Sequence, residues 1–173
     1  DIWVTFMRWY CDFGHVANAS VLYEDISFKK RALKSDIMER LAIEQMSLLF
    51  KNRINLSKAI SLLQQVLQIA DDSLYSLFQQ DSKRKVMIPK PEAARRLFSM
   101  LNSRRSRNWY HVNILNFLLH LCCLSGDVHN GFYILHEIYD DALNTNVHNA
   151  DVVDAIEPNQ QTIEYICKLF QMV

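Results

Sequence analysis

Two runs of cationic side chains, one of them followed by two aromatic residues, are the features of this sequence with the clearest chemistry. They comprise Lys83, Arg84 and Lys85, then Arg104, Arg105 and Arg107, and finally Trp109 and Tyr110. Lysine and arginine neutralise phosphates, and aromatic rings stack on nucleotide bases. The pattern indicates a path for single-stranded nucleic acid. Solvated surface cations, beside aromatic rings that pack at the start of a helix, also explain it. A formal net charge of zero weakens the nucleic-acid interpretation without excluding it.

Catalytic chemistry is not indicated. Asp71-Asp72 and Asp140-Asp141 are paired carboxylates, which solvation or helix capping explains better than metal binding. The six histidines form no ligand ladder, and the chain has neither a phosphate-binding loop nor a nucleophile elbow. We therefore expect no enzyme, no metal site and no cofactor. The cysteines lack C-x-x-C spacing and are expected to be buried free thiols in a reducing compartment. They are Cys11, Cys122, Cys123 and Cys167.

The elements that must position these residues follow from an internal repeat. Residues 1–26 align with residues 113–138 without a gap, so that Gly14 matches Gly126 and Ala19 matches Gly131. Each of the two matched glycines lies between apolar-periodic stretches, where a left-handed residue can end a first helix. Ala19 and Gly131 lie early in the second helix, where a small side chain permits close approach. The repeat predicts two similar helix–turn–helix units.

The apolar residues of the second helix recur at the same spacing in two further stretches: Leu56, Ala59, Leu62, Leu63 and Val66, and then Ala94, Leu97, Phe98 and Leu101. The repeats begin roughly 35 to 48 residues apart, which is typical of solenoid repeats. We predict an all-α, right-handed superhelical solenoid, a fragment of a longer array, that occupies all of residues 1–173. Its repeats are expected at about 1–35, 41–70, 76–104, 113–138 and 161–173, the last one truncated, with a partly disordered polar insertion at 139–160. In the third unit we expect a short helix over residues 72–80, a mobile loop over residues 81–90, and Pro91 in the first turn of the next helix.

Two further expectations come from the apolar residues. Trp3, Trp9 and Tyr10 lie on an apolar helix and are predicted to belong to the core. The longest apolar run, residues 114–124, is interrupted by Asn116 and His120, so no membrane-spanning helix is expected.

Two stretches resemble the pentatricopeptide-repeat family. NILNFLLHLCCLSGDVHNGFYILHEI, at residues 113–138, is similar to that repeat in its early Asn, late Cys, Gly turn and small residue in the second helix. WYCDFGHVANASVLYEDI, at residues 9–26, looks the same, and EPNQQTIEYICKLF is similar to the opening of a further unit, with Pro158, Asn159 and Thr162 in place. The more degenerate units resemble fungal or animal organellar members of the family.

The resemblance implies an RNA-binding solenoid of the mitochondrial matrix that acts in mRNA stability, processing or translation activation. Its partners would be single-stranded organellar mRNA or rRNA, and possible protein partners include the mitochondrial ribosome and other gene-expression proteins. In the family, a polar residue in the first helix and a residue just before the next unit read one base together. Carried over, that pair is Asn116 with Asn159, a combination associated with pyrimidines. Asn116 could equally be a capping or solvated residue.

A second function from a different class stays open. A tetratricopeptide-like solenoid could act as a protein adaptor whose groove holds a peptide, a ribosomal protein or a respiratory-complex partner. Salt-dependent binding to single-stranded RNA would favour the first function, whereas co-purification of a protein without RNA at low salt would favour the second.

Overall fold

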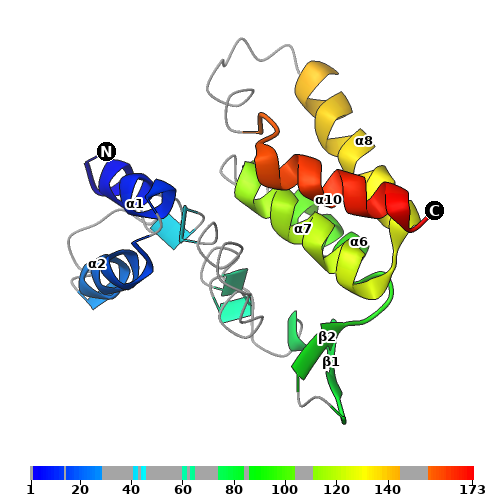
Figure 1. Cartoon of the computed structure of the whole chain (residues 1–173), viewed down its shortest axis with the longest axis horizontal. Coiled ribbons are helices and arrows are strands. Elements are labelled where there is room, and N and C mark those ends of the chain that lie inside the picture. Colours follow the sequence, from blue (N-terminus) through cyan, green and yellow to red (C-terminus); the bar gives the residue numbers. More distant parts are fainter. Residues whose placement is uncertain are drawn as a thin grey trace. The chain divides into compact units, whose positions relative to one another are not determined.

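The computed structural model describes residues 2–13, 15–28, 41–42, 44–45, 60–61, 63–64, 74–83, 86–103, 111–144 and 156–173. Within these residues the chain is mostly helical, with six helices and one small two-stranded hairpin. The chain divides into two compact units, residues 1–71 and 72–173, and each unit is described here by itself. Figure 1 labels the helices and strands.

The first unit contains a helical hairpin. α1 (Ile2–Asp12) and α2 (Val16–Phe28) pack together, and the turn between them is closed by the His15 N–H, which donates to Tyr10 O at 2.9 Å. The side chains of Val4 and Met7 are buried on α1, and those of Ala19, Tyr23 and Ile26 are buried on α2. The predicted helix–turn–helix over this stretch is confirmed, while Gly14 itself lies outside the described residues.

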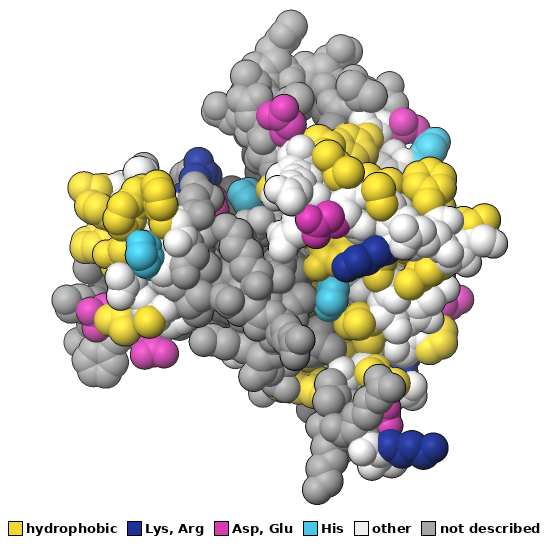
Figure 2. Space-filling view, in the orientation of Figure 1, with side chains coloured by type: hydrophobic (Ala, Val, Ile, Leu, Met, Phe, Trp, Pro, Cys, Tyr) yellow, Lys and Arg dark blue, Asp and Glu magenta, His cyan; other side chains and the backbone are white. Residues whose placement is uncertain are grey.

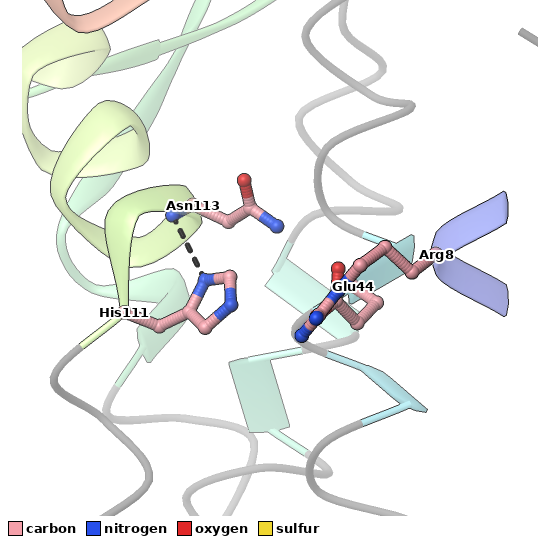
Figure 3. Close-up of polar contacts among 4 residues, drawn as sticks. All are labelled: Arg8, Glu44, His111 and Asn113. Atoms are coloured by element: carbon pink, nitrogen blue, oxygen red, sulfur yellow. Dashed lines mark hydrogen bonds and ion pairs between the residues drawn. The ribbon is translucent and has the colours of Figure 1, made fainter. Parts of the chain in front are cut away.

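An ion pair ties α1 to a helical segment further along the first unit. Arg8 donates from Nε at 3.1 Å and from Nη2 at 2.7 Å to Oε1 of Glu44, as Figure 3 shows. The Glu44 side chain is buried, as are those of Leu41 and Ala42 beside it. Little else of the predicted second repeat lies within the described residues, but its Leu63 is buried as expected.

The prediction that Trp3 and Trp9 belong to the core is wrong. Both indoles are exposed, and Tyr10 is half-buried. Val4 and Met7 are the buried side chains of α1 instead. A helix with apolar residues on two faces does not by itself reveal which face its neighbours cover.

The second unit contains the matching hairpin. α7 (Val112–Ser125) ends at Gly126, whose φ of 70° and ψ of 20° are left-handed, and α8 (Val128–Asn144) follows directly. The Asp127 N–H donates to Cys122 O at 2.9 Å, which is the counterpart of the His15 bond in the first hairpin. The predicted glycine turn is confirmed. The expected insertion from residue 139 is corrected, because α8 continues as helix through Asn144.

Two more helices pack around α7. α6 (Ala93–Ser103) buries Ala94, Leu97, Phe98 and Leu101, as the third repeat predicts, and it contacts both α7 and α8. α10 (Gln160–Gln171) begins where the fifth repeat was expected. Side chains early in α7 contact the start of α10 and later ones contact its later turns, so α10 lies along α7 in the same direction (Figure 1).

A β-hairpin replaces the helix and loop expected before α6. β1 (Phe78–Asp81) pairs antiparallel with β2 (Val86–Pro89). The all-α prediction is therefore wrong here. Within the helix predicted over residues 72–80, Leu74 and Tyr75 are helical, but the chain is a strand from Phe78 onward, because the β-branched pair Val86 and Ile88 favours an extended partner strand. α6 begins at Ala93, so Pro91 precedes the helix and does not occupy its first turn. The superhelical arrangement of all five repeats stays a prediction.

Candidate nucleic-acid interface

Three of the ten candidate RNA-binding residues lie within the described structure: Asn116 on α7, Asn159 immediately before α10, and Lys83 in the turn between β1 and β2. The other seven lie outside the described residues. They are Arg84, Lys85, Arg104, Arg105, Arg107, Trp109 and Tyr110. The interface is therefore built from the surroundings of Asn116 and Asn159.

α7 begins with a histidine cap. Nδ1 of His111 accepts the Asn113 N–H at 3.1 Å, so the imidazole satisfies one of the helix's free N-terminal donors (Figure 3). This cap fixes the first turn of α7, and Asn116 lies in the next turn. The side chains of Asn113 and Asn116 are both buried.

The side chains of Asn116 and Asn159 are in direct contact. Nδ2 of Asn116 donates to Oδ1 of Asn159 at 3.1 Å, and the Thr162 hydroxyl donates to Oδ1 of Asn116 at 2.8 Å. Asn159 and Thr162 also form a capping box. The Thr162 N–H donates to Asn159 Oδ1 at 3.0 Å, and the Asn159 N–H donates to Thr162 Oγ1 at 3.1 Å. These bonds join the first half of α7 to the start of α10.

One backbone group fixes the orientation of every amide in this network. The Thr162 N–H can only donate, so the Asn159 atom that faces it must be the oxygen Oδ1. The atom of Asn116 that faces this oxygen must then be the donor Nδ2, and its own oxygen faces the Thr162 hydroxyl. Nδ2 of Asn159 consequently points away from the network and makes no hydrogen bond within the part of the chain that the structure describes.

The burial of the three residues separates their roles. Asn116 and Thr162 are completely buried, whereas Asn159 is exposed. Asn116 is therefore not a solvated residue, and its side chain orients the amide of Asn159. Thr162 was expected only as part of the family pattern, and its hydrogen bonds to Asn116 and Asn159 were not predicted. The Asn-x-x-Thr spacing before an amphipathic stretch is the capping-box signal that identifies it.

Lys83 lies elsewhere in the second unit. It is exposed, and its N–H donates to Oδ1 of Asp81 at 2.9 Å within the β1–β2 turn. The hairpin reaches α7 through β2, and no contact links Lys83 to Asn159 within the described residues. The exposed cation nearest to the Asn159 network along the chain is Lys168 on α10, whose Nζ lies 5.3 Å from the Tyr165 ring centroid.

The titratable groups further along α7 and α10 do not form a reactive site. Burial, assisted by the charge of Lys168, lowers the pKa of His120 to about 4, so this imidazole is neutral at pH 7. Burial raises the pKa of Cys122 to about 12 and also raises that of Cys123. Both thiols therefore stay protonated and are poor nucleophiles. Cys167, in contrast, is exposed, which corrects the expectation that its thiol is buried.

Within the described ranges, no group of three or more His, Cys, Asp or Glu side chains is placed to hold a metal ion. No helix in the same residues is both long and apolar enough to cross a membrane. Comparison with protein-family models, with curated proteins and with solved structures finds no match to this chain.

Proposed function

We propose that this protein is a helical-repeat protein that binds single-stranded RNA and that the exposed amide of Asn159 contacts a pyrimidine. The observation that carries the proposal is the contact between Asn116 and Asn159. These two residues are far apart in the sequence and were paired by the family resemblance alone. They meet at the junction between two parallel helices that would be the first helices of successive repeats.

The free donors of Asn159 suit a pyrimidine carbonyl. Its Nδ2 group carries two N–H donors that no described residue uses, while its oxygen is held by α7 and α10. Uracil offers the carbonyl acceptors O2 and O4, and cytosine offers O2 and N3 on its pairing edge. The pairing edge of adenine offers a single acceptor, N1, beside its amino donor, so it can satisfy fewer of these donors than either pyrimidine. Because Asn116 and Thr162 fix the orientation of the Asn159 amide, its Nδ2 group can donate to a base without losing side-chain rotational entropy on binding.

Phosphate contacts would come from cations of the same unit. Lys168 is exposed on α10, and Arg95 and Arg96 are exposed on α6. The candidate cations Arg104, Arg105 and Arg107 precede α7 in the sequence and extend this set. Glu157 and Glu164 are exposed on either side of Asn159 and would repel a phosphate placed directly on the cap. We therefore place the base, and not its phosphate, at Asn159.

The full proposal is a pentatricopeptide-like solenoid that acts on mitochondrial transcripts in their stability, processing or translation. The resemblance of the two hairpins supports it, as does their shared turn, in which corresponding N–H groups bond to corresponding carbonyls. A protein adaptor of similar architecture is the competing function.

The test measures fluorescence anisotropy of labelled oligouridylate and oligoadenylate with wild type, Asn159→Asp and Gln160→Glu. Asp keeps the oxygen that caps α10 but removes the free donors, while Gln160→Glu adds the same charge on the neighbouring exposed residue. We expect Asn159→Asp to reduce the ratio of uridylate to adenylate affinity about tenfold, the value of one lost hydrogen bond. Gln160→Glu should weaken both RNAs equally.

Charge reversal at Arg104, Arg105 and Arg107 tests the phosphate path separately. Affinity for both RNAs should fall, its dependence on salt should become shallower, and helicity should be retained. No binding of either RNA at low salt refutes the proposed function and favours the adaptor. Binding in which Asn159→Asp and Gln160→Glu behave alike refutes only the assignment of Asn159.

A further inference from the structure

α1 carries an aromatic stripe on its outer side. Ile2, Phe6 and Trp9 of α1 and Phe13, the residue directly after α1, are spaced by four, three and four residues, as on one face of a helix. Their exposed fractions are 65%, 47%, 49% and 65%, and Trp3 beside them is 40% exposed. Figure 2 shows hydrophobic side chains gathered over this region. Large apolar groups on one contiguous face mark an interaction surface.

In the second hairpin, the residues that correspond to most of this face are covered by neighbouring elements. With residues 1–26 aligned on residues 113–138, the positions of Ile2, Trp3, Phe6 and Trp9 correspond to four α7 residues that are all buried: Ile114, Leu115, Leu118 and Leu121. The alignment also holds for the backbone. The 2.9 Å bond from His15 N to Tyr10 O corresponds to the 2.9 Å bond from Asp127 N to Cys122 O, and the Ala19-to-His15 bond corresponds to the Gly131-to-Asp127 bond.

Three helices and a strand enclose α7, and α1 has counterparts of two of the helices. α8 corresponds to α2, which packs on α1. α10 meets α7 where the rings of His120 and Tyr165 lie 5.5 Å apart, and the residue corresponding to His120 is Arg8, which is paired with Glu44. The helical segment around Glu44 thus contacts α1 at the position that corresponds to the contact of α10 with α7. A counterpart of α6 is not found among the described residues of the first unit.

We propose that the Ile2–Phe6–Trp9–Phe13 face of α1 is a docking surface for an amphipathic helix of the α6 kind. Such a helix offers small residues in its first turn and large apolar residues one and two turns later. This is the pattern of Ala93 and Ala94, Leu97 and Phe98, and Leu101 on α6, which packs against both α7 and α8. This assignment goes beyond RNA binding and is independent of it, because it concerns a different unit.

The charge on α1 favours a helix over RNA as the occupant. Arg8 is the only lysine or arginine of α1, and Glu44 neutralises its guanidinium. The stripe itself consists of uncharged side chains, so it offers nothing to neutralise phosphates. Burial of the stripe under an apolar helix face instead removes its indole and phenyl surface from water.

The experiment adds a copy of residues 91–103 ahead of the full chain, through a flexible linker as long as the native connection from Ser103 to Asn113. The fusion raises the effective concentration of the helix at α1. In a Trp109→Phe background, the remaining tryptophans, Trp3 and Trp9, report only on this face. The matched control carries the Leu97→Asp change in the added copy alone.

We expect the fusion to shift tryptophan emission to the blue and to reduce acrylamide quenching at least twofold, with neither effect in the control. Unchanged emission and quenching would overturn the proposal. It would also be overturned if oligouridylate quenched these tryptophans in the unfused protein in a salt-dependent manner, because RNA would then be the occupant. A dimer of the unfused protein that Phe6→Glu converts to monomer would overturn it in favour of a second copy.

Discussion

Gly131 allows α10 to pack against the α7–α8 hairpin, and Gly131→Ala tests how tightly. A Cβ at this position would lie 2.7 Å from Cδ1 and 3.2 Å from Cδ2 of Leu169, and 3.5 Å from Cβ of Cys122. Leu169 is fully buried, so its methyl groups cannot move into solvent to make room. Gly131 is therefore small because of a side chain on α10, a contact that the sequence analysis attributed to close approach within the hairpin.

Two opposing effects determine how much Gly131→Ala changes the free energy of unfolding. Overpacking a buried site costs about 1–3 kcal/mol, while replacing glycine by alanine within a helix gains about 1 kcal/mol. The net destabilisation expected for Gly131→Ala is about 0–2 kcal/mol, and Gly131→Leu should cost a few kcal/mol because three further carbon atoms must be placed. In a Leu169→Ala background the obstruction is gone, so the alanine should stabilise by about 1 kcal/mol.

The assay is urea unfolding followed by far-ultraviolet circular dichroism, analysed as a double-mutant cycle. Ala19→Gly is the matched control, since Ala19 occupies the corresponding position of the first hairpin and is buried with its methyl group in place. There the change to glycine should cost about 1 kcal/mol through helix propensity. The packing argument is refuted if Gly131→Ala stabilises the wild type as much as it stabilises the Leu169→Ala variant.

Three further predictions concern α7 and α10. The pKa of His120 is lowered to about 4 in the folded protein, so the unfolded chain binds more protons than the folded one between pH 6.5 and pH 4. The free energy of unfolding should therefore fall as the pH decreases through this window, by at most the order of 3 kcal/mol. A His120→Gln variant should show a flatter dependence of stability on pH. Thr162→Val leaves the buried oxygen of Asn116 unpaired and should lower the free energy of unfolding, measured by thermal unfolding, by about 1–3 kcal/mol. Adding Asn116→Val should recover most of this stability, and Thr162→Ser should not lose it. Under native conditions iodoacetamide should label the exposed Cys167 and leave the buried Cys122 unlabelled, as peptide mass spectrometry would show; equal labelling would contradict the burial.

The local features of the fold were predictable because short-range chemistry decides them. Gly126 has no Cβ, which permits the left-handed conformation that ends α7, and the apolar spacing on either side predicts two helices. The same spacing identified the buried residues Ala94, Leu97, Phe98 and Leu101 of α6. The β-hairpin was missed because the polar turn residues between its strands outweighed the short apolar run Val86-Met87-Ile88.

Which neighbours cover a helix could not be predicted. α1 and α7 share a pattern, yet Ile2, Trp3, Phe6 and Trp9 of α1 are exposed whereas their counterparts on α7 are buried. The difference depends on a third helix, α6, whose place against α7 follows from tertiary packing and not from periodicity. Similarly, Asn116 and Asn159 were paired by resemblance, while the burial of Asn116 depends on α10 lying along α7.

Comparison with the first unit shows that the polar junction at Asn116 is not required for packing at these positions. The position corresponding to Asn116 is Val4, and the one corresponding to Thr162, when the second and fifth repeats are aligned at their starts, is Ala42; both are buried and apolar. Burial of an unpaired amide or hydroxyl costs about 1–3 kcal/mol, so such polar groups are retained or lost together. Since apolar side chains occupy these positions in the first unit, stability alone does not require the polar pair of the second. What the polar pair adds is a fixed direction for the Asn159 amide, whose donors point away from the protein.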